Sequence, residues 1–333
     1  MDIKEKISLH SWAENVISQN NFSDAKLIYE GVYYAPGNIR NLIYAGEFEG
    51  KKSVLKIYDD PRLTNEPQSL EAFHTYNKSP FLKAPELFKY HMESPQKGWF
   101  IMEHLPKGAK HFTTPLSSVK RIEFLSIYKE YRKNFPTEPT RELLLAEKLP
   151  AHEFHTFRIS RWFELATKKD IEHKILHGES IFDDEFLSLY VEGLELVRKE
   201  FSTRKMVWCH GHFKPQEIFS VDGSATYYLT DFAHTHLFPE GYEFGFMIWA
   251  DYLMSSDWSL EYSDWKKPVF EWIESLRSVA EDLTIKRYDD LIRASLVERI
   301  MGTILGDVGS SDIDLKDKKH RLAYLYKLLG EFV

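Results

Sequence analysis

The spacing of hydrophobic residues changes along the chain and divides it into a β-rich part followed by a mainly helical part. Between residues 26 and 58, apolar residues gather in three short runs separated by turn-forming residues, which is typical of strands. Two further runs, at 86–93 and 98–105, predict another strand pair. Beyond residue 106 the apolar residues take the three- to four-residue spacing of a helix face, beginning with Ile122, Leu125 and Tyr128. The pattern predicts an α+β fold.

The same pattern predicts three segments. Residues 1–24 carry isoleucines and a tryptophan among charges, which indicates an amphipathic helical extension packing outside the main fold. Residues 25–105 form the β-rich part, and Pro106-Lys107-Gly108 marks its boundary. Residues 106–333 form the helical part, with later helices expected at 246–255, 266–282, 286–305 and 317–330.

Residues 206–236 interrupt the helical pattern. Two apolar runs, 206–209 and 218–221, are plausible buried strands. Asp222-Gly223 is a strong hairpin signal, and a returning strand is expected over 226–230. This hairpin should bring three polar side chains to one mouth: His212, Glu217 and Asp231.

Composition narrows the class of protein. The 333 residues are 43% hydrophobic and 28% charged, which is ordinary for a soluble globular protein with a sizeable core. A formal net charge of -8 argues against nucleic-acid binding, which needs a basic surface. The single cysteine, Cys209, excludes a disulfide framework and fits a reducing compartment. The charged N-terminus does not resemble a signal peptide and no apolar run approaches membrane length, so we expect a cytoplasmic protein without a membrane partner.

The hairpin carries the motif on which a family resemblance rests. His210-Gly211-His212, with Glu217 five residues further on and Asp231 after the second strand, resembles the catalytic centre of the aminoglycoside phosphotransferase and choline kinase family. That family has His-Gly-Asp, four residues, Asn, two strands and a final Asp. The resemblance covers residues 25 to 255 and implies a two-lobed protein-kinase-like fold, with a β-rich N-lobe, a hinge near 103–108 and a mainly helical C-lobe.

The resemblance also implies roles for the hairpin residues. In the family the first Asp orients or deprotonates the acceptor hydroxyl, while the Asn and the last Asp hold magnesium on the phosphates. Here His212 stands in place of the first Asp and Glu217 in place of the Asn, whereas Asp231 matches. The resemblance therefore points to His212 and Asp231 as the catalytic positions. Because hard cations accept carboxylate as well as amide oxygens, Glu217 and Asp231 are the expected ligands of Mg²⁺.

A nucleotide site is implied in the N-lobe. Lys56, alone within an apolar run, matches the lysine that holds the α- and β-phosphates of ATP, although a lysine on a solvated edge strand has the same pattern. Its acidic partner is expected to be Glu66, with Glu71 as the fallback. The remaining nucleotide contacts implied by the family are Gly37 and Asn41, in a loop that is equally an ordinary hairpin turn, and Glu103 in the hinge strand that meets adenine.

Two of the three chemical positions of the family motif, those of His212 and Glu217, are replaced in this sequence, so the sequence leaves the function open. The first hypothesis is a pseudokinase that binds nucleotide with impaired or absent phosphotransfer, partnered by an unknown small molecule or by a protein. The alternative is an active ATP-dependent kinase of a small-molecule hydroxyl, with a rewired His212 and Glu217 site. A third hypothesis, from a different class, is a transition-metal protein, because imidazole and thiolate suit such ions; its candidate ligands are Cys209, His210, His212, His234 and His236.

Aromatic and acidic residues interleave over residues 242–272, among them Tyr242, Trp265 and Trp272. Such a pattern suits a cationic ligand. It is also the pattern of a helix core with a solvated face, which we favour.

Overall fold

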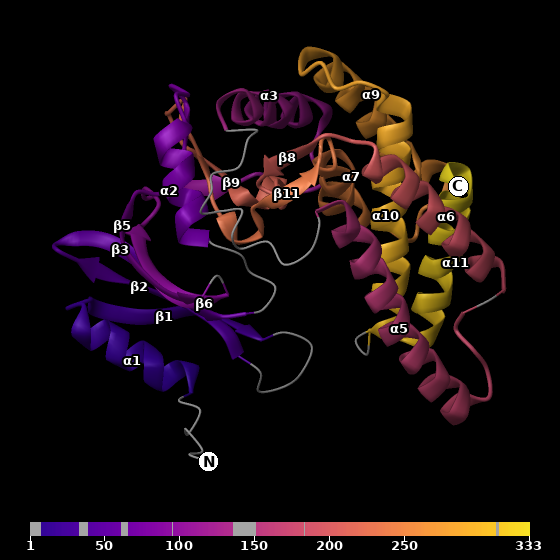
Figure 1. Ribbon diagram of the computed structural model, residues 1–333, viewed down its shortest axis with the longest axis horizontal. Helices are drawn as coiled ribbons and strands as arrows, with labels where there is room; N and C mark the ends of the chain where they lie inside the picture. Colours follow the sequence, from indigo (N-terminus) through magenta and orange to yellow (C-terminus); the bar gives the residue numbers. More distant parts are fainter. Residues whose placement is uncertain are drawn as a thin grey trace.

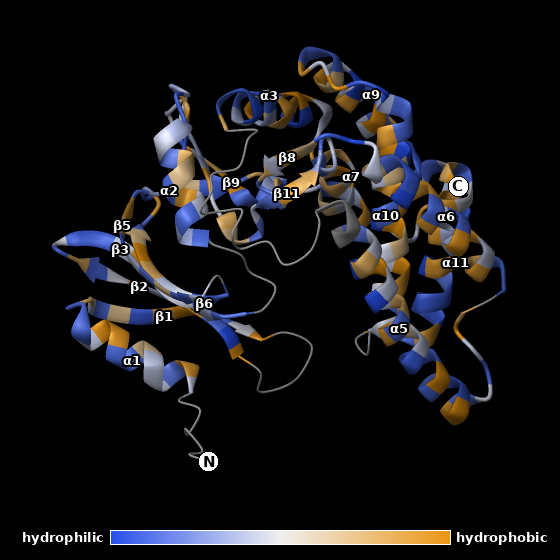
Figure 2. Ribbon diagram, in the orientation of Figure 1, coloured by the Kyte–Doolittle hydropathy of each residue, from blue (hydrophilic) through white to orange (hydrophobic). Residues whose placement is uncertain are grey.

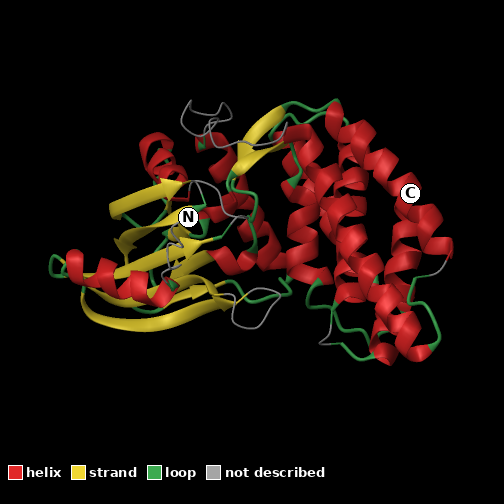
Figure 3. Ribbon diagram, turned by 60° about the horizontal axis from the view of Figure 1, so that its bottom comes forward, coloured by secondary structure: helices red, strands yellow, loops and turns green. Residues whose placement is uncertain are grey.

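The computed structural model describes residues 8–32, 39–60, 66–94, 96–135, 151–182, 184–310 and 313–333. The N-terminal sheet lies at one end of the molecule and most of the helices lie at the other, as Figures 1 and 3 show. The fold is protein-kinase-like, with an antiparallel N-terminal sheet followed by a mostly helical part, which confirms the predicted fold class.

The N-terminal sheet has five antiparallel strands in the order β1-β2-β3-β6-β5. Their bounds are β1 (Ser23–Val32), β2 (Ile39–Phe48), β3 (Lys51–Asp59), β5 (Leu87–Ser94) and β6 (Lys97–Glu103). The central strand β3 is buried on both faces, because successive side chains point to opposite sides of a sheet. Leu55 and Ile57 pack in one hydrophobic cluster, while Tyr58 packs in another with Phe100.

Helix α1 (Leu9–Gln19) begins after Ser8, whose hydroxyl accepts a hydrogen bond from the backbone N–H of Ser11. Ala13 and Val16 are buried with Leu55 and Ile57 of β3. The helix was expected to pack outside the main fold, and that prediction was wrong. Its apolar stripe instead covers one face of the sheet and completes the core of the N-lobe.

The helical part is built around α10 (Tyr288–Gly309), which packs against α5, α6, α7 and α11. Most of its residues are buried, whereas the surrounding helices alternate hydrophilic and hydrophobic colours along their length in Figure 2. The other helices are α2 (Glu66–Tyr76), α3 (Ser118–Asn134), α5 (Ala151–His177), α6 (Asp184–Ser202), α7 (Glu243–Ile248), α8 (Tyr262–Trp265), α9 (Lys267–Asp282) and α11 (Leu315–Phe332). Within the described residues, no helix is long and apolar enough to cross a bilayer.

The predicted hairpin is present. β9 (Ile218–Val221) pairs antiparallel with β10 (Tyr227–Leu229), and Gly223 has a positive φ in their connection. β10 also pairs with β4 (Leu82–Lys83), and β9 with β7 (Ala109–His111). β8 (Met206–Cys209) pairs with β11 (His236–Pro239). Through β4 and β7 the hairpin is tied to chain segments that leave the N-terminal sheet.

Candidate functional site

Lys56 lies on β3 and reaches a carboxylate from each part of the molecule. Its Nζ is 2.6 Å from Oε2 of Glu66, the first residue of α2, and 3.8 Å from Oδ1 of Asp231. The expectation that Lys56 lies near Glu66 or Asp231 is thus confirmed, and the edge-strand alternative is excluded because β3 is central. The fallback partner Glu71 instead accepts a hydrogen bond from the hydroxyl of Tyr90.

Burial and charge oppose each other in the Lys56–Glu66 pair. Burial lowers the pKa of Lys56, but the carboxylates of Glu66 and Asp231 outweigh it and leave the pKa raised. Burial raises the pKa of Glu66 to about 7, against the opposing effect of Lys56. The ammonium group therefore stays charged at neutral pH, whereas its partner sits near its own titration point.

His212 is placed by the turn that follows β8. His210, fully buried, bonds through Nε2 to the carbonyl oxygen of Thr230 at 2.8 Å. Gly211 has a φ of 77° and donates its N–H to Oε1 of the buried Glu243 at 2.9 Å. A side chain at residue 211 would meet the carbonyl oxygen of His234 at 2.3 Å, so the turn requires glycine. These anchors fix the direction in which His212 leaves the turn.

The imidazole of His212 lies beside Asp231 and inside an aromatic stack. Its Nδ1 is 3.8 Å from Oδ2 of Asp231, which is in the left-handed conformation with a φ of 59°. The rings of His212 and His234 are stacked with centroids 3.4 Å apart, and Phe246 stacks on His212 with centroids 4.9 Å apart. His212 and Asp231 are about a third exposed, with side-chain exposures of 30% and 27%.

The environment sets the protonation states of these groups. Burial lowers the pKa of His212 to about 4, although Asp231 opposes the shift. Burial acts to raise the pKa of Asp231, but the contact with His212 and the charge on Lys56 outweigh it and leave that pKa well below its usual range. At neutral pH the site therefore holds a neutral imidazole beside an ionised carboxylate.

Glu217 ends the short 3₁₀ helix η1 (Pro215–Glu217), and its carboxylate is already bonded within the chain. Oε1 is 3.0 Å from Nζ of Lys214, and Oε2 accepts a hydrogen bond from the hydroxyl of Thr230 at 3.0 Å. Burial raises the pKa of Glu217, and the nearby charge on Asp231 raises it further. Sequence reasoning missed Lys214 and Thr230, although the three-residue spacing of Lys214 and Glu217 was visible.

The remaining predicted nucleotide contacts are less closely grouped. Gly37 lies outside the described residues. Asn41 is not in a loop but in β2, paired with Tyr58 on one side and Gly31 on the other. Glu103 ends β6, where its carboxylate accepts a hydrogen bond from the backbone N–H of Glu86 at 3.2 Å. The roles of these residues toward a nucleotide stay predictions.

The five ligands of the transition-metal hypothesis do not converge. Cys209 is buried with its sulfur 3.4 Å from a guanidinium nitrogen of Arg132, and His210 bonds Thr230. The ring of His236 stacks on Trp208. Two of the five do approach each other, together with a carboxylate that the hypothesis omitted: His212, His234 and Asp231, whose ligand atoms all lie within 4.8 Å of one another.

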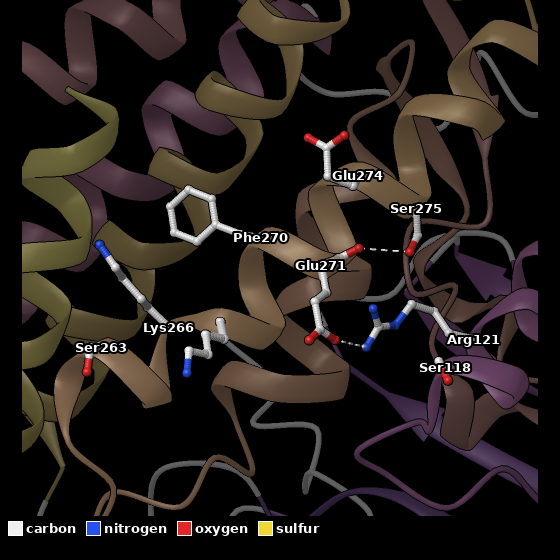
Figure 4. Close-up of a pocket in the computed structure, with 9 residues that line it drawn as sticks. Ser118, Arg121, Ser263, Lys266, Phe270, Glu271, Glu274 and Ser275 are labelled. Carbon is white, nitrogen blue, oxygen red and sulfur yellow. Dashed lines mark hydrogen bonds and ion pairs between the residues drawn. The ribbon is translucent and has the colours of Figure 1, made fainter.

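A groove of about 680 Å³ lies between the start of α3 and helices α8 and α9. Arg121, Lys266 and Phe270 line it, and Figure 4 shows Arg121 directed at Glu271, to which its guanidinium group is bonded. None of the predicted site residues lines this groove. The aromatic residues of 242–272 do not form a ligand wall either, because Tyr242, Trp265 and Trp272 are almost completely buried. The helix-core interpretation of that segment is confirmed.

The structure has the protein-kinase-like fold, with Lys56 paired to Glu66 and with His212 beside Asp231. The sequence matches no protein-family model and no curated protein. The structure matches an ethanolamine kinase of Plasmodium vivax at 15% identity, covering 98% of this chain and 91% of that chain, with a TM-score of 0.64. It matches a microcompartment-associated aminopropanol kinase at 14% identity over 97% of each chain, also with a TM-score of 0.64.

A third similar structure is a thermostable mutant of the aminoglycoside phosphotransferase APH(4)-Ia in a ternary complex with ADP and hygromycin B. It is 11% identical over 96% of each chain, with a TM-score of 0.55. The chain therefore has the fold of the aminoglycoside phosphotransferase and ethanolamine kinase structures. The likeness extends over nearly the whole chain, whereas the sequence motifs reached only residues 25 to 255.

Proposed function

We propose that this chain is a pseudokinase of the aminoglycoside phosphotransferase type, which binds a nucleotide but transfers its phosphoryl group poorly or not at all. The observation that carries the proposal is the contrast between the two halves of the site. Lys56 and Glu66 form the pair that phosphate binding needs. The hairpin on the other side of the site has the imidazole of His212 where phosphoryl transfer needs a carboxylate base. It has Glu217, whose carboxylate is already bonded within the chain, where phosphoryl transfer needs a free metal ligand.

Nucleotide binding is supported by the charge at the cleft. The ammonium of Lys56 is buried, stays charged and is held by Glu66 and Asp231. The similar aminoglycoside phosphotransferase structure contains ADP, which supports nucleotide binding by the same fold here. In this chain Lys56 would meet the phosphates, and Glu66 would keep its side chain extended toward them.

Loss of phosphotransfer is supported by the poor fit of Mg²⁺. This ion requires an octahedral shell of oxygen atoms. Both carboxylate oxygens of Glu217 are bonded to Lys214 and Thr230, and residue 212 offers nitrogen. The carboxylate of Asp231 is the remaining oxygen donor of the three predicted positions, and it also pairs with Lys56, so the donor set does not fit Mg²⁺ as the family pattern would hold it.

The second candidate is an active kinase of a small-molecule hydroxyl, and one observation favours it. With a pKa of about 4, His212 is neutral at physiological pH and its basicity is that of an ordinary aspartate. Such a base would lose activity below about pH 5 rather than near the 6.5 of a free histidine. The ethanolamine and aminopropanol kinases suggest amino alcohols as the first acceptors to assay.

The first experiment is a titration with ATP, with and without Mg²⁺, followed by the thermal unfolding midpoint. We expect ATP to raise the midpoint, because a ligand that binds only the folded state stabilises it. The gain should change little when Mg²⁺ is added and should disappear in Lys56→Met. Absence of any shift in the wild-type protein would remove the nucleotide-binding half of the proposal.

The second experiment restores the family pattern with His212→Asp and Glu217→Asn together. If the site is merely degraded, ATP hydrolysis should rise from background, because the base and the metal ligand return while Lys56 and Asp231 stay. An active kinase that depends on His212 should instead lose activity in the same variant. A clear wild-type rate that collapses in His212→Ala would refute the pseudokinase proposal in favour of the second candidate.

A further inference from the structure

The segment that carries Asp231 also turns His234 back toward the catalytic loop. Asp231 adopts the left-handed conformation and is followed by a single 3₁₀ turn, η2 (Phe232–His234). Phe232 and Ala233 are buried, with Ala233 in a cluster with Tyr58 and Phe100, so the turn is anchored in the core. One nitrogen of His212, one of His234 and a carboxylate oxygen of Asp231 consequently lie within 4.8 Å of one another.

The donor set of this triad differs from that of a magnesium site. Imidazole nitrogen suits zinc, cobalt, nickel and copper ions, whereas Mg²⁺ prefers oxygen. Two imidazoles and one carboxylate are the ligands of many transition-metal sites that leave positions open to water or substrate. The partial exposure of His212 and Asp231 gives an ion a path to the site from solvent.

One donor atom of the triad has no partner within the chain. Nδ1 of His212 is buried, lies 3.8 Å from Oδ2 of Asp231 and makes no hydrogen bond within the described residues. A buried nitrogen without a hydrogen-bond partner is available to an ion.

Two features of the site oppose an ion. The rings of His212 and His234 are stacked at an angle of 22°, and a metal bonds in the plane of each ring, so one ring must turn. His212 is stacked between Phe246 and His234, whereas His234 stacks on His212 and makes no ring hydrogen bond within the described residues, so His234 is the ring that we expect to turn. The ammonium of Lys56 would repel a cation at Asp231, but Glu66 lies 2.6 Å from that ammonium and offsets its charge.

We propose that His212, Asp231 and His234 bind one transition-metal ion, in preference to Mg²⁺, with the remaining coordination positions open to water. The inference does not rest on nucleotide binding, since every ligand comes from the hairpin and the turn that follows it. The metal takes the place beside Asp231 at which the kinase fold would otherwise hold magnesium.

The test is a titration of the full chain with Co²⁺ alone, followed by visible absorption. We expect saturation at one ion per chain, with ligand-field bands that Zn²⁺ abolishes and that a large excess of Mg²⁺ leaves unchanged. His234→Ala should weaken binding at least tenfold, and Asp231→Asn should do the same. His234→Gln, which keeps the size of the side chain, serves if the alanine variant does not fold, as judged by circular dichroism.

A matched control comes from a second histidine pair. His173 and His177 lie one turn apart on α5 with ring centroids 4.5 Å apart, but within the described residues no third ligand joins them in a group that could hold a metal ion. His177→Ala should leave the affinity of the single site unchanged. The proposal is overturned if Co²⁺ does not saturate at millimolar concentration, if equimolar Mg²⁺ displaces it, or if binding is lost in His177→Ala but kept in His234→Ala.

Discussion

At the scale of single residues, the properties of the candidate site depend on which charged side chains are paired with another residue of the chain. Lys56 is shared between Glu66 and Asp231, while Glu217 is bonded to Lys214 and Thr230. The first arrangement keeps a buried ammonium group between two carboxylates. The second commits both carboxylate oxygens of Glu217 within the chain, which supports the proposal that residue 217 does not serve as a free metal ligand.

The pKa of Glu66 makes the loss of Lys56 depend on pH. Burial already raises that pKa to about 7, and in Lys56→Met it should rise further because the opposing ammonium is gone. When the pKa of a carboxyl group is raised in the folded state, the free energy of unfolding falls as the pH rises. The reason is that the unfolded chain releases the proton at a lower pH than the folded chain does. We therefore expect Lys56→Met to be more destabilising at pH 8 than at pH 6 by about 1 kcal/mol, measured by urea denaturation.

Lys52→Met, on the exposed part of the same strand, is the control and should show no such difference. Equal destabilisation by Lys56→Met at both pH values would show that Glu66 does not titrate near neutrality.

At the scale of elements, the turn at Gly211 depends on close approach as well as on glycine's conformational freedom. Gly211 and Gly223 both have φ near 77°, but a side chain at 211 would strike His234 and Phe238, whereas nothing lies within 4 Å at 223. Gly223→Ala should cost about 1–2 kcal/mol from backbone strain alone. Gly211→Ala should cost at least about 1 kcal/mol more, from overpacking. Urea denaturation measures both, and equal costs would mean that the turn relaxes freely around His234.

The elements show where sequence reasoning succeeds and where it fails. The hairpin was predictable because Asp222-Gly223 is a local signal between two apolar runs. In α3 the repeat of Ile122, Leu125 and Tyr128 correctly indicated a helix, and Leu125 and Tyr128 are buried. Ile122 is 71% exposed, however, and the repeat did not identify the buried Phe124 and Ile127. Local spacing reveals that a helix forms. Its rotation is decided by the partners it packs against.

The candidate site, too, was predictable from the sequence only in part. Lys56, Glu66, His212 and Asp231 were identified from a motif, and the structure brings them together. The stacking of His234 on His212 was not predictable, because it depends on the left-handed conformation of Asp231. The hydrogen bond from Thr230 to Glu217 was likewise not predictable, since the two residues are thirteen positions apart in the sequence.

At the scale of the whole molecule, a buried ionic network ties the helical part together behind the hairpin. Glu298 of α10 is fully buried and bonded to Arg158 and to Arg299. The guanidinium group of Arg299 also lies over the ring of Phe246, which in turn stacks on His212. The network thus supports the position of His212 through Phe246.

This network makes the fold sensitive to acid through His155 of α5. Its ring is fully buried beside Tyr242, with Nδ1 3.4 Å from Oε1 of Glu298, and burial lowers its pKa to about 4. Because the unfolded chain binds the proton near pH 6.5, this histidine contributes stability above pH 6.5 that is lost as the pH falls toward 4. A shift of this size corresponds to about 3 kcal/mol, and His212 acts in the same direction.

The variant His155→Gln keeps a polar group near Glu298 but cannot be protonated. It should be less stable than wild type at pH 7, because the ring packing is lost, yet its stability should fall less steeply between pH 6.5 and 4. Urea denaturation at several pH values gives both slopes, with His177→Gln, at the exposed end of the same helix, as the control that keeps the wild-type slope. Identical slopes in His155→Gln and wild type would mean that His155 is protonated within the folded protein, and that the network around Glu298 accommodates a third positive charge without loss of stability.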